Sequence, residues 1–341
     1  MYVVTGGAGF IGSHLVRALN DQGISDVLVV DDLTRGAKFE NLRDCVLADY
    51  MDKAELRRWV ERDGLPRLSA ILHQGACADT MERDGRYLMD NNFTCSKELL
   101  HFALRRETPF VYASSAAVYG LSRDSREDPV QERPLNPYGW SKLVFDQHVR
   151  RVLPEAKSTV VGLRYFNVYG PRERHKGRMA SMVHQLWRQL SEDGVARLFE
   201  GTEGFQDGEQ RRDFVYVEDV ARVNLEFAQG PPRQGVLNLG TGQSESFNQV
   251  ARAIIDQLGR GRIEYVPFDP ALRGRYQSFT QADLRGLRAA GWTGAFTPLA
   301  EGIRASVAAW QAETCPSGAS GAAGDGELAG ASGAAVRAAR S

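Results

Sequence analysis

The chain has 341 residues, with 42 Lys and Arg against 43 Asp and Glu, so its formal net charge is −1. This length can bury one large core or two moderate ones, and the balanced charge argues against a nucleic-acid-binding face. The four cysteines form no CxxC pair and no Cys/His cluster. We therefore expect no metal site and a reduced, cytoplasmic protein. Neither a signal-peptide pattern nor an apolar run of membrane-spanning length occurs, so we expect no membrane span.

The chain opens on short apolar residues that lead directly into three glycines. Val3 and Val4 predict a strand, and apolar residues spaced over 11–19 predict a helix. Between these elements, Gly6 would permit a tight turn, Gly9 would let the backbone approach a diphosphate, and Gly12 would let the helix pack closely on the strand. The helix N-terminus then faces the anion. This context favours a dinucleotide site over an ordinary glycine turn.

The second predicted strand, 27–30, ends in Asp31, where a carboxylate can accept hydrogen bonds from the adenosine ribose. Arg35 and Lys38 follow and could meet a 2′-phosphate. The alternative for Arg35 is a solvated loop with scattered charge. Asp31 and Asp32 would repel that phosphate, so these residues leave NADP and NAD both open.

Two further strand–helix units follow. We expect a strand near 45–48, with Asp49 as a candidate for the adenine edge, and a helix from Lys53. The next strand, 69–76, ends in small residues over which a cofactor could lie. Its His73 is expected to be packed and hydrogen-bonded rather than catalytic. Asn91 opens a long predicted helix, as a cap or as a cofactor contact.

The fifth unit carries the candidate chemistry. The strand 110–115 ends in hydroxyl groups, of which Ser115 is the last. Tyr138 and Lys142 are four residues apart, so they share one helix face. We expect the ammonium to lower the phenol pKa, so that Tyr138 exchanges a proton with a carbinol while a hydride moves to or from a nicotinamide. The alternative is a surface helix pair.

The glycine-rich turn, Ser115, Tyr138 and Lys142 resemble the short-chain dehydrogenase/reductases. Segments 118–120 and 164–172 are similar to the extended branch of that family, which holds nucleotide-sugar epimerases, dehydratases and reductases. The resemblance implies that the three side chains form the catalytic trio. It also implies that Asn167 contacts substrate and that Val168 lies beside the nicotinamide.

More segments are similar to the epimerases of this branch that act on ADP-heptose, and the similarity runs from residue 1 to about 313. They are 90–92, 173–181, 198–201, 274–277 and 280–284. The resemblance implies an isomerase that interconverts the D-glycero and L-glycero forms of ADP-β-D-manno-heptose at C6″. It would use transient oxidation with bound NADP, in synthesis of the heptose precursor of the lipopolysaccharide core. A homo-oligomer is also implied, and the family suggests a pentamer.

The same resemblance assigns the site residues. Lys176 would be a second acid/base, across the sugar from Tyr138, and its alternative is a solvated or phosphate-facing loop lysine. The implied cofactor contacts are Gly6, Gly9, Phe10, Ile11, Gly12, Asp31, Asp32, Lys38, Lys53, Gln74, Gly75, Ala76, Cys77, Ala78, Asn91, Lys142, Val168 and Lys176. The implied substrate contacts are Ser115, Asn167, Arg178, His184, Phe199, Glu200, Gly201, Thr202, Arg212 and Tyr276.

Three positions depart from the family pattern. An insertion at 206–210 leaves either Arg211 or Arg212 as the matching arginine. Arg178 stands where a small serine-like contact is expected, so it could crowd the site or add a phosphate ligand. Asp32 replaces an expected amide, which adds negative charge beside the ribose.

We therefore predict an α/β fold, a Rossmann-type doubly wound parallel sheet with a smaller C-terminal α/β lobe. The NADP-binding domain would comprise 1–170 with returning segments near 212–245, and the lobe would comprise mainly 171–313 and cover the substrate cleft. The Ala/Gly/Ser-rich tail, 314–341, is expected to be disordered. Two other functions stay open: another nucleotide-sugar epimerase or dehydratase of this branch, and a catalytically silent nucleotide-binding protein.

Overall fold

The structure is a computed structural model that describes residues 1–34, 36–272, 274 and 276–314. Arg35 and nearly all of the predicted tail lie outside the described residues. Among the described helices, none combines the length and the apolar character that a membrane crossing needs.

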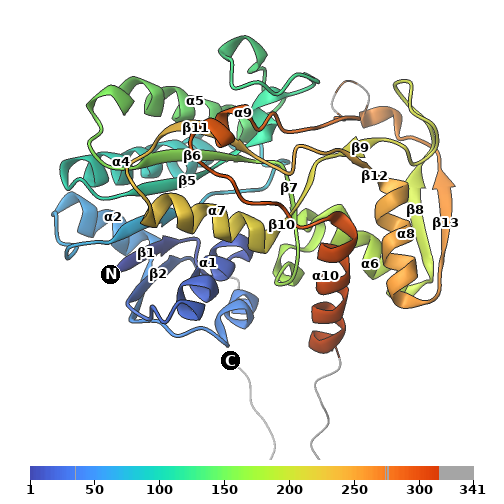
Figure 1. Ribbon diagram of the computed structural model, residues 1–341, viewed down its shortest axis with the longest axis horizontal. Coiled ribbons are helices and arrows are strands. Elements are labelled where there is room, and N and C mark those ends of the chain that lie inside the picture. Colours follow the sequence, from blue (N-terminus) through green and yellow to red (C-terminus); the bar gives the residue numbers. More distant parts are fainter. Residues whose placement is uncertain (35, 273, 275, 315–341) are drawn as a thin grey trace, which may run out of the picture.

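Seven strands of the described residues form one parallel sheet in the order β11-β6-β5-β4-β1-β2-β3 (Figure 1). Their bounds are β1 Tyr2–Thr5, β2 Val27–Asp31, β3 Asp49–Asp52, β4 Ala70–His73, β5 Phe110–Ser115, β6 Val160–Tyr165 and β11 Gln234–Leu239. The chain steps outward from β1 to β3 and then restarts at β4 on the other side of β1. This order is that of a doubly wound Rossmann sheet, so the predicted fold class is confirmed, and so is the return of 236–240 to the sheet.

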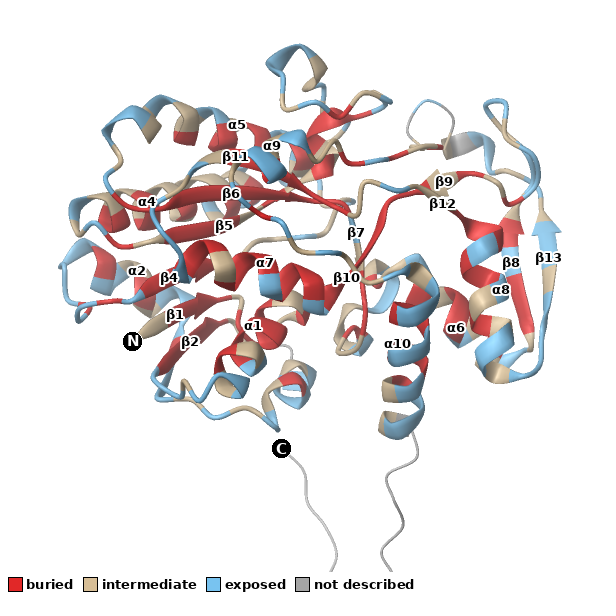
Figure 2. Ribbon diagram, viewed as in Figure 1, coloured by how far each residue is buried: buried red, intermediate tan, exposed pale blue. Residues whose placement is uncertain are grey.

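Successive side chains of a strand point to opposite faces of the sheet. Consecutive residues of the central strands are buried (Figure 2), so both faces of the sheet are covered. Val4, Val29 and Leu72 lie side by side in the register and pack into one core with helices α1 and α7. Their neighbours Val3 and Leu28 pack into the other core, with helices α2, α4 and α5. The helix bounds are α1 Phe10–Asp21, α7 Val217–Gln229, α2 Lys53–Glu61, α4 Cys95–Arg105 and α5 Pro137–Val152.

A smaller lobe lies beyond the carboxyl ends of these strands (Figure 1). Helices α6 Met182–Glu192, α8 Phe247–Leu258 and α10 Leu299–Thr314 share a third core, whose centre holds Trp187 and Trp310. The parallel pair β8 Val195–Phe199 and β13 Arg262–Val266 packs beside them. Ser246 caps α8 through a capping box with Gln249. The remaining elements are α3 Gly85–Leu88, α9 Arg285–Ala289, β7 Asn167–Tyr169, β9 Arg211–Arg212, β10 Phe214–Tyr216 and β12 Glu245–Ser246.

Three predicted elements were wrong in place or extent. The third strand is Asp49–Asp52 rather than 45–48. Asn91 does not open a helix, because it lies in a π-helical turn, Met89–Thr94, between α3 and α4, and Asp84 is the cap. The residues 212–217 read in sequence as a single strand, but the structure divides them: β9 ends at Arg212, and the next strand, β10, ends at Tyr216.

Candidate active site

The glycine-rich turn joins β1 to α1 with almost no space between the two elements. Gly6 has a φ of +65°, the left-handed conformation that favours glycine. A Cβ added at Gly12 would overlap the carbonyl oxygen of Gly6. The roles predicted for these two glycines are therefore confirmed. The turn leaves the first amides of α1, from Phe10 on, at the carboxyl edge of the sheet, where a diphosphate can bind them.

Two acid–lysine pairs lie at the end of β2. The Asp31 carboxylate is almost fully buried, and it accepts hydrogen bonds from the Ala8 amide and from Lys38 Nζ, both at 2.8 Å. Asp32 pairs with Lys53 Nζ, also at 2.8 Å. That ammonium, together with Thr34, lowers the pKa of Asp32. Each carboxylate that would repel a phosphate therefore has a lysine beside it.

The end of β4 and the residue that follows it form hydrogen bonds with polar side chains of neighbouring elements. His73 is buried between Thr5 Oγ1 at 2.6 Å and Ser96 Oγ at 2.8 Å. Burial lowers the pKa of His73 to about 3, so it stays neutral. This geometry supports the packed, hydrogen-bonded role that we predicted for it. Gln74 accepts a hydrogen bond from the Tyr165 hydroxyl at 2.9 Å.

Asn92 is a structural residue of the site that the sequence analysis missed. Its side chain accepts from the Cys77 amide at 2.8 Å and donates to the Cys77 carbonyl at 3.0 Å. It also donates to Ser141 Oγ of α5 at 3.0 Å, so it fixes the predicted cofactor loop against the helix that carries Tyr138 and Lys142. Its neighbour Asn91 instead donates to the Tyr87 carbonyl at 2.9 Å. The π-helical turn gives the two asparagines different partners, and such turns are enriched at functional sites. The sequence carries no signal for this turn.

The structure brings the predicted catalytic trio together where β5 meets α5. The Ser115 hydroxyl is hydrogen-bonded to the Tyr138 phenol. Lys142 is buried on the same face of α5 and donates from Nζ to the Ala113 carbonyl at 2.8 Å. Burial lowers the pKa of Lys142 to about 8, and the carboxylate of Asp146 opposes that change.

One expectation about the trio is wrong for this structure. Burial raises the pKa of Tyr138, and the hydrogen bond with Ser115 opposes the change. The ammonium of Lys142, which we expected to lower this pKa, is directed at the Ala113 carbonyl instead. Tyr138 is therefore a neutral phenol here, ready to donate a proton.

Lys176 lies on the segment that follows β7, and it contacts the glycine-rich turn. Its Nζ is 4.7 Å from the centre of the Phe10 ring and 3.3 Å from Glu173 Oε2. Glu173 is fully buried and also accepts from the Ser181 amide at 2.6 Å, so the carboxylate is fixed by the start of α6. Among the described hydrogen bonds and ion pairs, Lys176 meets Glu173 and no member of the trio.

Arg212 is a buried cation in an aromatic clamp. Its guanidinium lies 5.0 Å from the ring centre of Tyr276 and 5.6 Å from that of Phe247. Burial lowers the pKa of Arg212, and the nearby Tyr276 and Glu203 oppose the change. Its guanidinium donates to the Arg211 carbonyl at 3.0 Å and forms no ion pair with a described carboxylate. Arg211 instead donates to the hydroxyl and carbonyl of Ser244. Arg212 is the more deeply buried of the two, and its one described side-chain hydrogen bond leaves most of its donors available, so it is the better match for an anionic ligand.

His184 has a buried side chain, and neither of its ring nitrogens has a hydrogen-bond partner among the described residues. The ring packs edge-on against Trp310, with centroids 5.0 Å apart, and lies 5.5 Å from the Trp187 ring. Burial lowers the pKa of His184 to about 4, with nearby cations adding to the effect. A buried imidazole left unsatisfied in this way is compatible with the predicted substrate contact.

The remaining predicted substrate residues line the end of β8 and the segments beside it. The Phe199 ring meets Tyr276 edge-on at 5.9 Å, and the Gly201 amide donates to Asp207 at 2.7 Å. The Glu200 amide donates to the Val266 carbonyl, and the Thr202 carbonyl accepts from the Phe205 amide. Asn167 accepts from Thr280 at 3.2 Å. Arg178 is largely exposed and pairs with Asp79 at 2.9 Å, so it crosses to the predicted cofactor loop rather than crowding the substrate residues.

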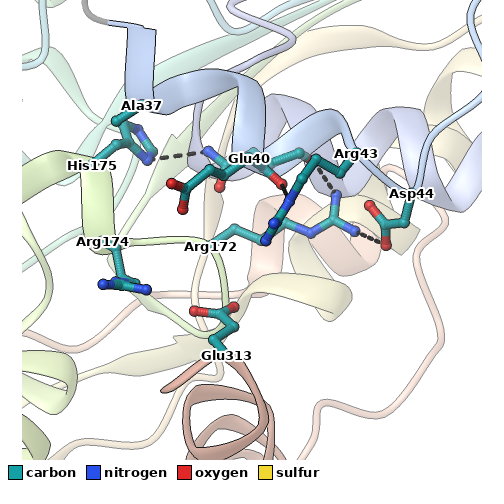
Figure 3. Close-up of a pocket in the computed structure, with 9 residues that line it drawn as sticks. Ala37, Glu40, Arg43, Asp44, Arg172, Arg174, His175 and Glu313 are labelled. Atoms are coloured by element: carbon teal, nitrogen blue, oxygen red, sulfur yellow. Dashed lines mark hydrogen bonds and ion pairs between the residues drawn. The ribbon is translucent and has the colours of Figure 1, made fainter. Parts of the chain in front are cut away.

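A cavity of about 560 Å³ lies beside the glycine-rich turn, and none of the predicted site residues lines it. Figure 3 shows side chains of both charges facing this space, including Arg172, which pairs with Asp44 at 2.6 Å. Its lining residues are Ala37, Glu40, Asn41, Arg43, Asp44, Arg172, Arg174, His175 and Glu313. Three arginines face three carboxylates, so this cavity has no charge excess that would select an ion.

Nucleotide-sugar enzymes are among the known proteins that this chain resembles. The family described as the NAD dependent epimerase/dehydratase family matches residues 2–240. An ADP-L-glycero-D-manno-heptose-6-epimerase of Alkalilimnicola ehrlichii is 57% identical over 305 residues, which are 89% of this chain and 95% of the relative.

Solved structures of nucleotide-sugar epimerases are also similar to this chain. The Helicobacter pylori ADP-L-glycero-D-manno-heptose-6-epimerase superposes with a TM-score of 0.79 and 31% identity, over 91% of this chain and 96% of that chain. A Thermus thermophilus UDP-glucose 4-epimerase in complex with NAD gives 0.72 and 29%, over 91% and 98%. The chain belongs to the NAD-dependent epimerase/dehydratase family.

Proposed function

We propose that this enzyme inverts C6″ of ADP-glycero-β-D-manno-heptose, interconverting the D-glycero and L-glycero forms through transient oxidation with bound NADP. The observation that carries the proposal is the 57% identity to a relative named for that reaction, over 95% of the relative's length. The site adds the chemistry, since Ser115, Tyr138 and Lys142 meet at one strand end. The product would supply the heptose precursor of the lipopolysaccharide core.

Tyr138 and Ser115 handle the proton of the C6″ hydroxyl. The nicotinamide, when bound, supplies an acceptor and then a donor for the hydride. Tyr138, activated when the site is loaded, exchanges the hydroxyl proton in one of the two orientations of the sugar. Ser115, already bonded to the phenol, orients the same oxygen. Lys142 is held by Ala113 on the same helix face, where it would anchor the nicotinamide ribose and support the phenolate electrostatically.

Inversion requires a second acid/base, because the keto sugar must present both faces to one cofactor. We assign this role to Lys176. Its ammonium lies over Phe10, at the glycine-rich turn, and buried Glu173 holds it there. A group at this position approaches the sugar from a different element than Tyr138 does. Each base then serves the oxygen in one orientation of the sugar.

The cofactor site fits a dinucleotide, because Gly12 leaves no room for a Cβ and Asp31 is buried at the end of β2. We propose NADP rather than NAD. Lys38 and Lys53 neutralise Asp31 and Asp32, and both ammonium groups remain partly exposed for a 2′-phosphate. The mass of the dinucleotide released on denaturing the purified protein tests this assignment, and the mass of NAD would contradict it.

Arg212 and His184 are proposed to bind the substrate, since the buried Arg212 guanidinium has no ion pair with a described carboxylate and neither ring nitrogen of His184 has a described partner. The guanidinium suits the ADP diphosphate, and the imidazole suits sugar hydroxyls. The functional test is to incubate the purified protein with ADP-heptose and to follow the C6″ configuration by proton NMR. Unchanged stereochemistry, with bound cofactor confirmed, would refute the proposal, and faster turnover of UDP-glucose would favour another epimerase of the family.

A further inference from the structure

Asp146 lies on α5, on the same face as the other two helix residues of interest: it is one helical turn after Lys142 and two turns after Tyr138. Its side chain is fully buried. Oδ1 accepts a hydrogen bond from the Tyr112 hydroxyl at 2.9 Å, and Oδ2 accepts one from Ser114 Oγ at 2.8 Å. Both donors belong to β5, the strand that ends in Ser115.

These contacts form a continuous set of links between α5 and β5. Tyr112 and Ser114 bond to Asp146, and the carbonyl of Ala113 between them accepts from Lys142 Nζ at 2.8 Å. Three successive strand residues are thus tied to one face of the helix. The next residue, Ser115, is the one that meets the Tyr138 phenol.

The same carboxylate belongs to a buried charge network. Arg164 of β6 donates from Nε to Asp146 Oδ2 at 2.9 Å. Arg164 also pairs with Glu132, which pairs with Arg150. Two carboxylates and two guanidinium groups balance each other within this network. Lys142 is therefore an additional buried cation beside it, and Asp146 is the network member that acts on it.

We propose that Asp146 is a positioning residue, which aligns Ser115 with Tyr138 by bonding β5 to α5 and whose charge keeps Lys142 an ammonium. The catalytic consequence rests on the proposed function. The other groups that face Lys142 supply no full charge: His73 is neutral, Cys77 has a pKa raised by burial, and Tyr138 is a neutral phenol. Removal of the Asp146 charge thus leaves burial unopposed, and burial favours the uncharged amine.

The charge of Lys142 can be measured directly, because the chain has only six lysines. Protein labelled with ¹³C at lysine Cε would be titrated by NMR, and the Lys142 signal identified by its absence from Lys142→Arg. We expect a midpoint near pH 8 in the wild type. In Asp146→Asn the midpoint should fall by about one pH unit or more. An unchanged midpoint would overturn the proposal.

Ser114→Ala is the matched control, since it removes a hydrogen bond to the same carboxylate and no charge. Its midpoint should match the wild type, and a fall as large as that of Asp146→Asn would mean that packing, not charge, sets it. If Asp146→Asn fails to fold, the pair Asp146→Asn with Arg164→Gln removes both charges, and the midpoint should still fall because it is Asp146, and not Arg164, whose charge acts on Lys142.

Activity gives the second measurement. The alkaline limb of kcat should move to lower pH in Asp146→Asn by the same amount as the titration, which a purely structural role would not produce. The NMR titration uses no substrate. A wild type that titrates near pH 8 yet does not epimerise ADP-heptose would therefore refute the proposed function and not the assignment of Asp146.

Discussion

Replacement of Arg212 by glutamine should weaken substrate binding and leave the fold nearly as stable. The guanidinium is buried between Tyr276 and Phe247 without a described ion pair, which is a costly arrangement unless a ligand supplies the anion. Charge-assisted hydrogen bonds contribute about 1.5–3 kcal/mol. At about 1.4 kcal/mol per factor of ten, the KM for ADP-heptose should rise roughly 10- to 150-fold.

The free energy of unfolding should change in a different way. The variant loses two cation–π contacts, worth roughly 1 kcal/mol each, and it also relieves the burial of an unpaired cation. These effects oppose each other, so we expect a net change within about 1 kcal/mol. Arg212→Gln should therefore separate affinity from stability, which urea unfolding of the ligand-free protein would measure.

Arg211→Gln is the matched control, one residue away in the same strand. Arg211 already has its partners in Ser244, so it has no need of a ligand. Its replacement should leave KM near the wild-type value, measured by the proton NMR assay and by inhibition with ADP. Equal effects of the two variants, or a larger effect of Arg211→Gln, would refute the assignment of the diphosphate to Arg212.

Other changes give further expected outcomes. Tyr138→Phe should lower kcat by about 10²-fold or more, because it removes the proton donor, while the content of bound dinucleotide, measured by mass spectrometry, stays unchanged. Lys53→Met leaves Asp32 unpaired, so the ratio of NADP to NAD in the released dinucleotide should fall by about tenfold or more; an unchanged ratio would exclude contact with the 2′-phosphate. The protein should lose stability as the pH falls from about 6.5 to 4. Burial lowers the pKa values of four histidines, which stay neutral in the fold and become charged on unfolding: His14, His73, His175 and His184. The free energy of unfolding should therefore change by at most about 5 kcal/mol per pH unit. Urea midpoints measured across this pH range would show the change.

Local spacing predicted much of the site and the main sheet. The glycine turn, the strand ending in Asp31 and the Tyr138–Lys142 pair depend on residues close in the chain, and each was found in its expected element. The third strand was misplaced because 45–48 is the more apolar stretch. The true strand, Asp49–Asp52, lies at the edge of the sheet, where Met51 alone is buried. An edge strand needs little apolar character, so hydrophobicity points to the wrong residues.

Interactions between distant segments could not be read in this way. The Tyr138 pKa depends on where the Lys142 ammonium points, and that is set by a carbonyl 29 positions earlier. Asp146 continues the four-residue spacing of Tyr138 and Lys142, a signal present in the sequence. Its meaning nevertheless required Arg164 and the hydroxyls of β5. The choice between Arg211 and Arg212 likewise depended on which side chain is buried.

The last helix, α10, has a consequence for any shortened form of this enzyme. Its Trp310 ring rests on the imidazole of His184, and its Ile303 sits in the same third core. A chain cut before residue 310 would therefore lose the ring that packs on His184, a proposed substrate residue, as well as packing of the third core. Truncations at this end should be judged by turnover and not by solubility alone.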